Sequence, residues 1–155
     1  MIKDIFAETL IHYGSSKFSP EMFNPIKNRI SNKPEGGLWT SPLNSNYGWK
    51  NWCEDIWGFN NKDTFELTLK SDANILIIDS YKDLDNICER QYNYIYSDYR
   101  SLNFELLSQK YEAIWLTEKG LNETHCSIPL NLNGWDCESV LIMNPNCFNI
   151  IKKQK

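Results

Sequence analysis

The sequence predicts an α+β fold with a mostly antiparallel sheet of about six strands and two or three helices. Short apolar segments that alternate or are β-branched recur along the chain, and segments with helical spacing separate only some of them. All six prolines lie at or before Pro42 or at and after Pro129, so the longest regular elements are expected between them. With 155 residues, the chain has the length of one domain, and we expect residues 1–155 to form it.

The first predicted strand covers Thr9–Tyr13, where β-branched and aromatic residues run up to a glycine. A loop with three prolines follows over residues 18–35. Residues 36–42 form the next predicted strand, which has glycines before it and a proline at its end. Residues 49–59 carry tryptophans and an isoleucine at helical spacing, which predicts a short amphipathic helix.

The middle of the chain predicts two strands and a long helical region. Residues 64–70 alternate strictly between apolar and polar, as in a half-buried strand. Residues 74–79 contain an unbroken apolar run, which predicts a strand buried on both faces. Ser80 and Asp83 then resemble a capping box. Apolar residues at steps of three and four follow, so one or two helices are expected over residues 83–109.

The last third of the chain predicts three more strands, over residues 113–117, 138–143 and 147–151. The formal net charge of −4 leaves no basic surface for phosphate backbones, so nucleic acid is not the expected binding partner. Residues 1–11 lack the long apolar stretch of a signal peptide or membrane span.

The five cysteines indicate a reducing compartment. They are odd in number and none lies in a C-x-x-C pair, so neither a zinc ribbon nor a redox motif is predicted. Without a signal peptide, such a set is typical of free thiols in the cytoplasm. We therefore expect a cytoplasmic protein with no bound metal and no membrane association.

Two histidines limit the options for acid–base chemistry. His12 ends a predicted strand beside Gly14, where it could hold a ligand or serve a structural purpose. His125 adjoins Cys126, but neighbours on an extended chain point to opposite sides. The sequence therefore does not favour a Cys–His nucleophilic pair.

Trp39, Thr40 and Ser41 lie on the short strand between the glycines and Pro42. An indole and two hydroxyls there could form one wall of a cleft, with the ring as a stacking surface. The alternative is a core tryptophan beside hydroxyls that cap a turn. The other tryptophans singled out have core-like spacing and are expected to pack, namely Trp49, Trp52, Trp57 and Trp115.

Glu138 opens the predicted strand that contains Val140, and Asp136 lies two residues before it. A carboxylate at the mouth of a buried strand is poorly placed for packing. Residues two apart on an extended chain face the same way. The pair could therefore serve one reacting centre, with one carboxylate stabilising positive charge and the other positioning a nucleophile. The alternative is a solvated turn ahead of a strand.

Together these segments resemble the ADP-ribosyltransferase family. In that family a first strand carries His or Arg near a Gly, a second strand carries a Tyr or Ser-Thr-Ser motif, and a late strand begins with the catalytic Glu. Residues 10–15, 37–42 and 136–145 are similar to these motifs in that order. The predicted strands at residues 75–79 and 113–117 lie between the second and third motifs. The resemblance spans most of the chain.

The resemblance implies a split antiparallel sheet around a cleft for NAD, which is a substrate. Glu138 would bond the 2′-hydroxyl of the nicotinamide ribose and stabilise the oxocarbenium-like transition state. Asp136 would position the acceptor, and His12 would hold a ribose hydroxyl. The remaining residues of the implied NAD site are Tyr13, Gly14, Trp39, Thr40 and Ser41, with Trp39 stacked on nicotinamide and Gly14 admitting the carboxamide.

The activity implied by the resemblance is mono-ADP-ribosylation of a macromolecular acceptor, a protein rather than a nucleic acid. Small chains of this kind resemble toxins and phage-encoded effectors, including anti-CRISPR transferases. Two alternatives stay open on the residues alone. One is an aromatic-rich binding protein or inhibitor without turnover, and the other is an NAD glycohydrolase that uses the same site.

Overall fold

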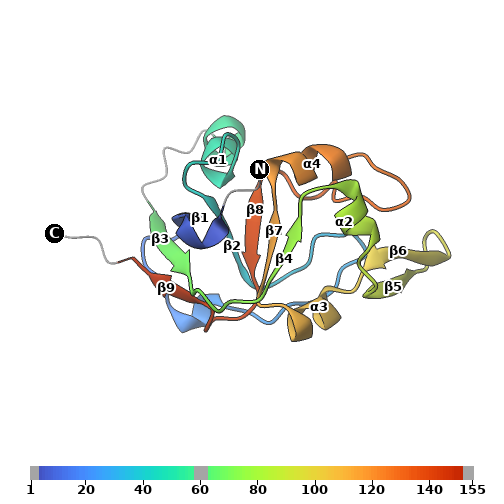
Figure 1. The fold of residues 1–155 in the computed structure, drawn as a ribbon, viewed down its shortest axis with the longest axis horizontal. Helices are drawn as coiled ribbons and strands as arrows, with labels where there is room; N and C mark the ends of the chain where they lie inside the picture. The colour runs from blue at the N-terminus through green and yellow to red at the C-terminus, as the bar shows by residue number, and fades with distance from the viewer. Residues whose placement is uncertain (1–3, 58–62, 152–155) are drawn as a thin grey trace.

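The computed structural model describes residues 4–57 and 63–151, which form a mixed α+β fold around a curled seven-stranded sheet (Figure 1). The strand order is β4-β7-β8-β2-β1-β3-β9. These strands are β1 (Leu10–Tyr13), β2 (Leu38–Pro42), β3 (Thr64–Leu69), β4 (Ile75–Ile78), β7 (Ala113–Leu116), β8 (Ser139–Ile142) and β9 (Phe148–Ile150).

A separate two-stranded hairpin, β5 (Arg90–Asn93) with β6 (Asp98–Leu102), projects at one end of the molecule (Figure 1). The helices of the described part are α1 (Trp49–Trp57), α2 (Tyr81–Asp85), α3 (Phe104–Lys110) and α4 (Glu118–Thr124), with the 3-10 turns η1 (Ile5–Ala7) and η2 (Pro20–Met22). None of these helices is long and apolar enough to cross a membrane.

The sheet brings three distant parts of the chain together at its centre, where β8, β2 and β1 are neighbours. Both contacts of β2 are antiparallel, with Thr40 opposite Val140 on β8 and Ser41 opposite Ile11 on β1. The parallel pair in this sheet is β4 with β7. Three segments singled out in the sequence therefore lie side by side.

The two faces of the sheet bury different apolar clusters, because successive strand residues point to opposite sides. Leu141 belongs to the cluster that helices α2 and α3 cover, with Leu84 and Leu107. Val140 belongs to the other cluster. We call these the Leu141 face and the Val140 face.

The predicted strands are all present, with ends displaced by one or two residues. This holds for the strands expected at residues 9–13, 36–42, 64–70, 74–79, 113–117, 138–143 and 147–151. In β3 the predicted alternation is present, with Phe65, Leu67 and Leu69 buried and the residues between them half-buried. The predicted helix at 49–59 is α1 as far as Trp57, and residues 58–59 lie outside the described residues.

The expectation that residues 74–79 are buried on both faces is wrong. Strand β4 is at the edge of the sheet, so only Ile78 of its four residues is buried. Strand β4 pairs with β7 on one side and, as an edge strand, has no neighbour in the described part of the sheet on its other side.

The prediction that one or two helices cover residues 83–109 is wrong for the middle of that range. Helices α2 and α3 occupy only its two ends, and the β5–β6 hairpin lies between them. Ile95 and Tyr99 contributed to the helical spacing in the sequence. Both side chains are exposed, so their positions do not define the buried face of a helix. Ser97, at φ 52°, reverses the chain in the turn.

Candidate functional site

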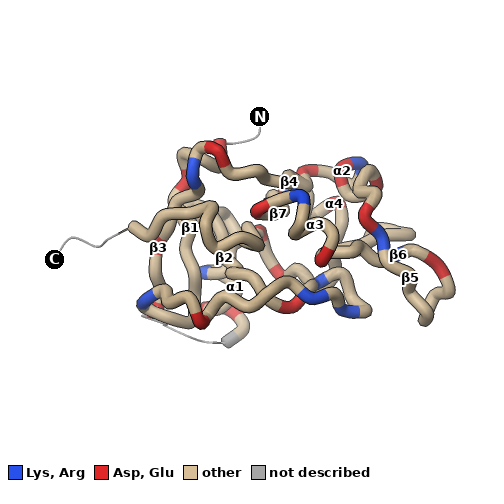
Figure 2. Tube along the Cα trace, turned by 90° about the horizontal axis from the view of Figure 1, so that it is seen from below, with Lys and Arg blue, Asp and Glu red and all other residues tan. Residues whose placement is uncertain are grey.

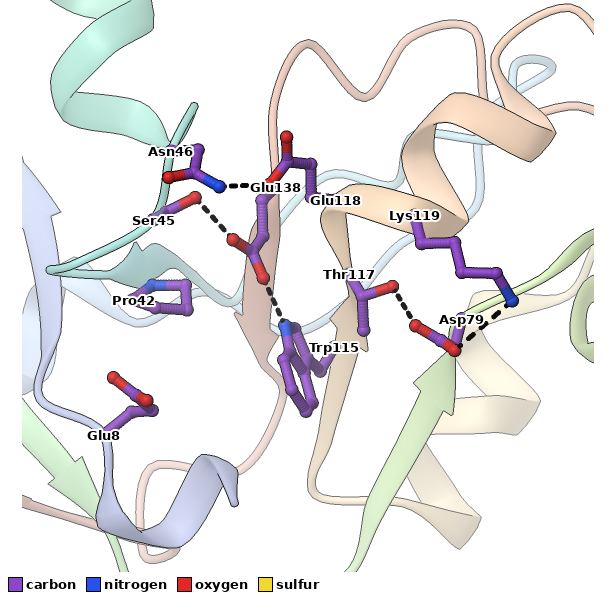
Figure 3. Close-up of a pocket in the computed structure, with 10 residues that line it drawn as sticks. All are labelled: Glu8, Pro42, Ser45, Asn46, Asp79, Trp115, Thr117, Glu118, Lys119 and Glu138. Carbon is purple, nitrogen blue, oxygen red and sulfur yellow. Dashed lines mark hydrogen bonds and ion pairs between the residues drawn. The ribbon is translucent and has the colours of Figure 1, made fainter. Parts of the chain in front are cut away.

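A cavity of about 160 Å³ opens where the ends of four sheet strands meet (Figure 3). Strands β4 and β7 are parallel, so Asp79 and Thr117 follow them at the same edge of the sheet. Strand β8 is antiparallel to β7, so Glu138 arrives there just before its first residue. Strand β2 is antiparallel to β8 and delivers Pro42. The residues that line the cavity are Glu8, Pro42, Ser45, Asn46, Asp79, Trp115, Thr117, Glu118, Lys119 and Glu138.

Glu138 is the buried carboxylate of this cavity, with 7% of its surface exposed. Its Oε2 accepts a hydrogen bond from the indole Nε1 of Trp115 at 3.0 Å, and its Oε1 accepts one from the Ser45 hydroxyl. Figure 3 shows the carboxylate between these two donors. Both donors are uncharged, so they orient the carboxylate without neutralising it. A carboxylate held in this way can stabilise positive charge that develops beside it.

The cavity as a whole is acidic. Its lining includes four carboxylates and one ammonium, that of Lys119. Lys119 pairs with Asp79 at 3.7 Å, and Asp79 also accepts a hydrogen bond from Thr117 at 2.6 Å. Asn46 donates to Glu118 at 3.0 Å. The lining therefore favours a cationic group over an anionic one.

His12 lies on the Val140 face of the sheet. Its ring stacks near Phe65 of the Val140 cluster, with centroids 4.9 Å apart. Its Nδ1 lies 2.8 Å from the carbonyl oxygen of Trp39. A carbonyl can only accept, so Nδ1 carries the proton and Nε2 is left as an acceptor. Burial lowers the pKa of His12, and the bond to the Trp39 carbonyl opposes that shift.

Thr40 lies on this face too, since it is opposite Val140. It is fully buried, and its hydroxyl donates to the Val140 carbonyl at 2.8 Å. Glu138, two residues before Val140, contacts Trp115 of the same cluster. The structure thus places His12, Thr40 and Glu138 on one face of three adjacent strands, although His12 and Thr40 do not line the Glu138 cavity.

Trp39 and Ser41 lie on the opposite face. Trp39 is opposite Leu141, and its ring contacts that of Trp135 with centroids 4.8 Å apart. Ser41 accepts a hydrogen bond from the backbone N–H of Trp49 at 2.6 Å, at the start of α1. The structure therefore does not bring Trp39 or Ser41 to the Glu138 cavity, and Ser41 serves instead to cap a helix.

Asp136 also lies apart from Glu138. It forms an ion pair with Lys33 at 3.0 Å, and Lys33 lies over the Trp39 ring. The expectation that Asp136 and Glu138 face the same way assumed extended backbone. The chain instead bends at Cys137 and Glu138, so the two carboxylates have different partners.

Tyr13 and Gly14 end strand β1. Tyr13 is half-buried, and burial, with Glu54 and Cys53 nearby, raises its pKa. Gly14 has φ +126°, a conformation that L residues rarely adopt. Its N–H donates to the Asp63 carbonyl at 2.9 Å. Gly14 therefore allows the backbone to turn next to the His12 ring.

Ser45 and Trp115 hold the Glu138 carboxylate, and the sequence indicated neither of them as a site residue. The core-like spacing of Trp115 predicts only packing for it. A buried indole N–H needs an acceptor, however, and Glu138 is the acceptor here. Ser45 lies in a polar turn after β2 with no motif around it. Only the need for partners around a buried Glu138 could have suggested such residues.

No group of three or more metal-ligating side chains is found among residues 4–57 and 63–151. Comparison of the chain with protein-family models, characterised proteins and solved structures found no match.

Proposed function

We propose that this protein is a mono-ADP-ribosyltransferase that moves ADP-ribose from NAD to a macromolecular acceptor and releases nicotinamide. One observation carries the proposal: Glu138 is buried at the start of β8, oriented by two neutral donors, and faces a cavity. This is the position and environment that a late-strand catalytic glutamate requires in the family that the sequence resembles.

The neighbouring strands support the same proposal. The segment with His12 is on β1, the segment with Thr40 is on β2, and Glu138 precedes β8, and these strands are adjacent. We extend the proposal to the fold, as a split sheet of the ADP-ribosyltransferase type with the nicotinamide end of NAD in the Glu138 cavity at the edge of the sheet. Trp115 takes the place expected of Trp39 as the aromatic side chain beside Glu138.

The chemistry follows from charge. When the bond between nicotinamide and ribose C1′ breaks, its electron pair goes to the nicotinamide nitrogen and C1′ becomes positive. Glu138 accepts a hydrogen bond from the ribose 2′-hydroxyl and stabilises that charge. The acceptor's nucleophile then bonds to C1′ and loses its proton. The Nε2 acceptor of His12, a half-buried residue, holds a ribose hydroxyl.

The size and charge of the cavity limit what enters it. Typical small-molecule pockets measure roughly 300–1,000 Å³, whereas this cavity measures about 160 Å³. It therefore admits only one end of a dinucleotide. The acidic lining favours the cationic nicotinamide end and repels the pyrophosphate, which lies outside. Asp136 is outside this site because it pairs with Lys33.

A non-catalytic binding protein is the second candidate, and the exposed tyrosines of the β5–β6 hairpin favour it.

To separate the candidates, purified protein is incubated with NAD labelled in its adenylate, with and without bacterial lysate. A transferase labels a macromolecule in the lysate. An NAD glycohydrolase releases free labelled ADP-ribose without any lysate. A binding protein does neither, and that result would refute the enzyme.

A further inference from the structure

The β5–β6 hairpin exposes more aromatic surface than a solvated hairpin needs. Five of its large side chains are between 53% and 68% exposed, namely Tyr92, Tyr94, Ile95, Tyr96 and Tyr99. Ile30 and Ile128 beside it are exposed as well. Figures 1 and 2 both show the hairpin projecting from one end of the molecule. Contiguous apolar surface of this kind marks interaction sites in soluble proteins.

The turn of the hairpin is ordered by its own contacts. In the turn, the side-chain oxygen of Asn93 accepts hydrogen bonds from the N–H groups of Ile95 and Tyr96, at 3.0 and 3.4 Å. The amide of Asn93 donates to the buried Ser101 hydroxyl at 2.9 Å. Because these contacts already order the turn, docking it loses little conformational entropy.

The aromatic side chains are also ordered. Tyr92 and Tyr99 meet edge to face with centroids 5.6 Å apart. The guanidinium of Arg100 lies over the Tyr96 ring, 5.6 Å from its centroid. Tyrosine and arginine side chains fixed in this way are the usual anchors of protein interfaces.

The charges of this surface suit another protein surface rather than a polyanion. Arg29 and Arg100 each carry their own counter-ion, Glu35 and Asp98. The third arginine, Arg90, donates from its guanidinium to the backbone carbonyls of Asp85, Ile87 and Tyr99. No lysine is present in residues 90–102. The arginines are thus engaged within the chain, and no track of free cations follows a phosphate backbone.

We infer that the occupant of this surface is a second copy of the same chain, docked about a two-fold axis. A groove of about 550 Å³ runs beside the hairpin and is lined by Ile30, Tyr96, Ile128 and Asn131 among others. The projecting turn and the groove therefore share one end of the molecule. A two-fold axis can then place each turn in the partner's groove, as a self-complementary interface requires.

The exposed area and the charges of the hairpin surface agree with a second copy of the chain as its occupant. Four tyrosines exposed to this degree supply about 500 Å² of surface, and the three isoleucines add to it. A stable interface needs roughly 800 Å² from each partner. The chain as a whole carries a net charge of −4, so other surfaces of two copies repel. The internally paired charges of this surface allow two copies to meet here.

The test is sedimentation velocity over a range of protein concentrations. Wild type is compared with the Tyr94→Ser/Tyr96→Ser double variant and with Ile56→Ser, which removes an exposed apolar side chain on α1. We expect a dimer for wild type and Ile56→Ser, and a dissociation constant at least about tenfold higher for the double variant. Hydrogen exchange of the wild type locates the interface without any variant. We expect residues 92–99 to gain protection from exchange as the protein concentration rises.

Two results would overturn the inference. One is a wild-type protein that stays monomeric at every concentration, which would leave the surface to a different protein or to nucleic acid. The other is a dimer that the double variant forms equally well and that protects some other segment from exchange. Neither result depends on whether the protein cleaves NAD.

Discussion

Glu138 depends on the Trp115 indole for one of its two oriented hydrogen bonds. The Trp115→Phe substitution removes that donor and keeps most of the apolar ring. We expect nicotinamide release to fall by about tenfold, and the free energy of unfolding to fall by roughly 1–3 kcal/mol, because a buried acceptor loses its partner. Enzyme kinetics and urea unfolding measure the two effects.

Trp49→Phe is the matched control. The Trp49 indole N–H is buried and has no acceptor among the described residues, so removing it breaks no hydrogen bond. The account predicts little loss of activity or stability for this variant. Equal losses in Trp49→Phe and Trp115→Phe would show that the effect comes from ring size and not from the bond to Glu138.

His12 should make stability depend on pH in a defined direction. Burial lowers its pKa in the folded protein, so the unfolded chain binds the proton more readily. Below about pH 6.5, the ordinary histidine value, protonation therefore favours unfolding. The free energy of unfolding should fall as pH drops below that value and level off once the pH is below the folded-state pKa.

The His12→Asn variant tests this pH dependence. Its amide can still donate to the Trp39 carbonyl, but it does not titrate. Urea unfolding at several pH values between 5 and 8 should show a shallower dependence in the variant than in wild type. An identical dependence in both proteins would assign the pH effect to other groups.

At the scale of elements, the sequence predicted correctly those segments in which buried residues recur with one regular period. Strand β3 alternates because one of its faces is buried, so Phe65, Leu67 and Leu69 could be predicted. In the hairpin, Ile95 and Tyr99 are apolar but exposed, so their spacing led to a wrong prediction of helix. Helix α4 was not predicted, although Thr117 caps its first turn by accepting from the Gly120 N–H.

Asn32 is one of the residues that attach the hairpin to the rest of the molecule. The Asn32 side chain accepts from the Leu102 N–H at 2.8 Å and donates to the Asn131 carbonyl at 2.9 Å. We expect Asn32→Ala to lower the free energy of unfolding by about 1–3 kcal/mol and to speed exchange of the Leu102 amide. Asn133→Ala, which removes a single 3.3 Å bond to the His125 carbonyl, should change exchange at Leu102 little. Unchanged Leu102 exchange in Asn32→Ala would contradict this attachment.

At the scale of the whole molecule, two buried cysteines should report global unfolding. Burial raises the pKa of Cys137 and that of Cys147 to about 12, so neither forms much thiolate in the folded state. Cys88 and Cys126 are exposed. Timed alkylation at pH 8 followed by mass spectrometry should modify the exposed pair first, and Cys137 and Cys147 only in step with urea unfolding. Early alkylation of Cys137 would indicate local opening near Glu138.

The candidate site could be predicted only in part, because sheet order is a property of the whole chain. Glu138 was indicated by a local signal, a carboxylate at the mouth of an apolar strand. Its partners Ser45 and Trp115 come from 93 and 23 residues away. They meet Glu138 because β2 and β7 flank β8. Trp39 was misplaced for a related reason, since its face of the sheet depends on its register with Leu141.

The most direct test of the account is the rate of nicotinamide release by wild type and by Glu138→Gln, measured with the matched variant Glu118→Gln. Glu118 lines the same cavity but is bound by Asn46 at its rim. We predict that Glu138→Gln loses activity by at least about 100-fold, while Glu118→Gln stays within a few-fold of wild type. If Glu138→Gln, folded and at the same concentration, releases nicotinamide at the wild-type rate, Glu138 is not the catalytic residue and the central claim is wrong.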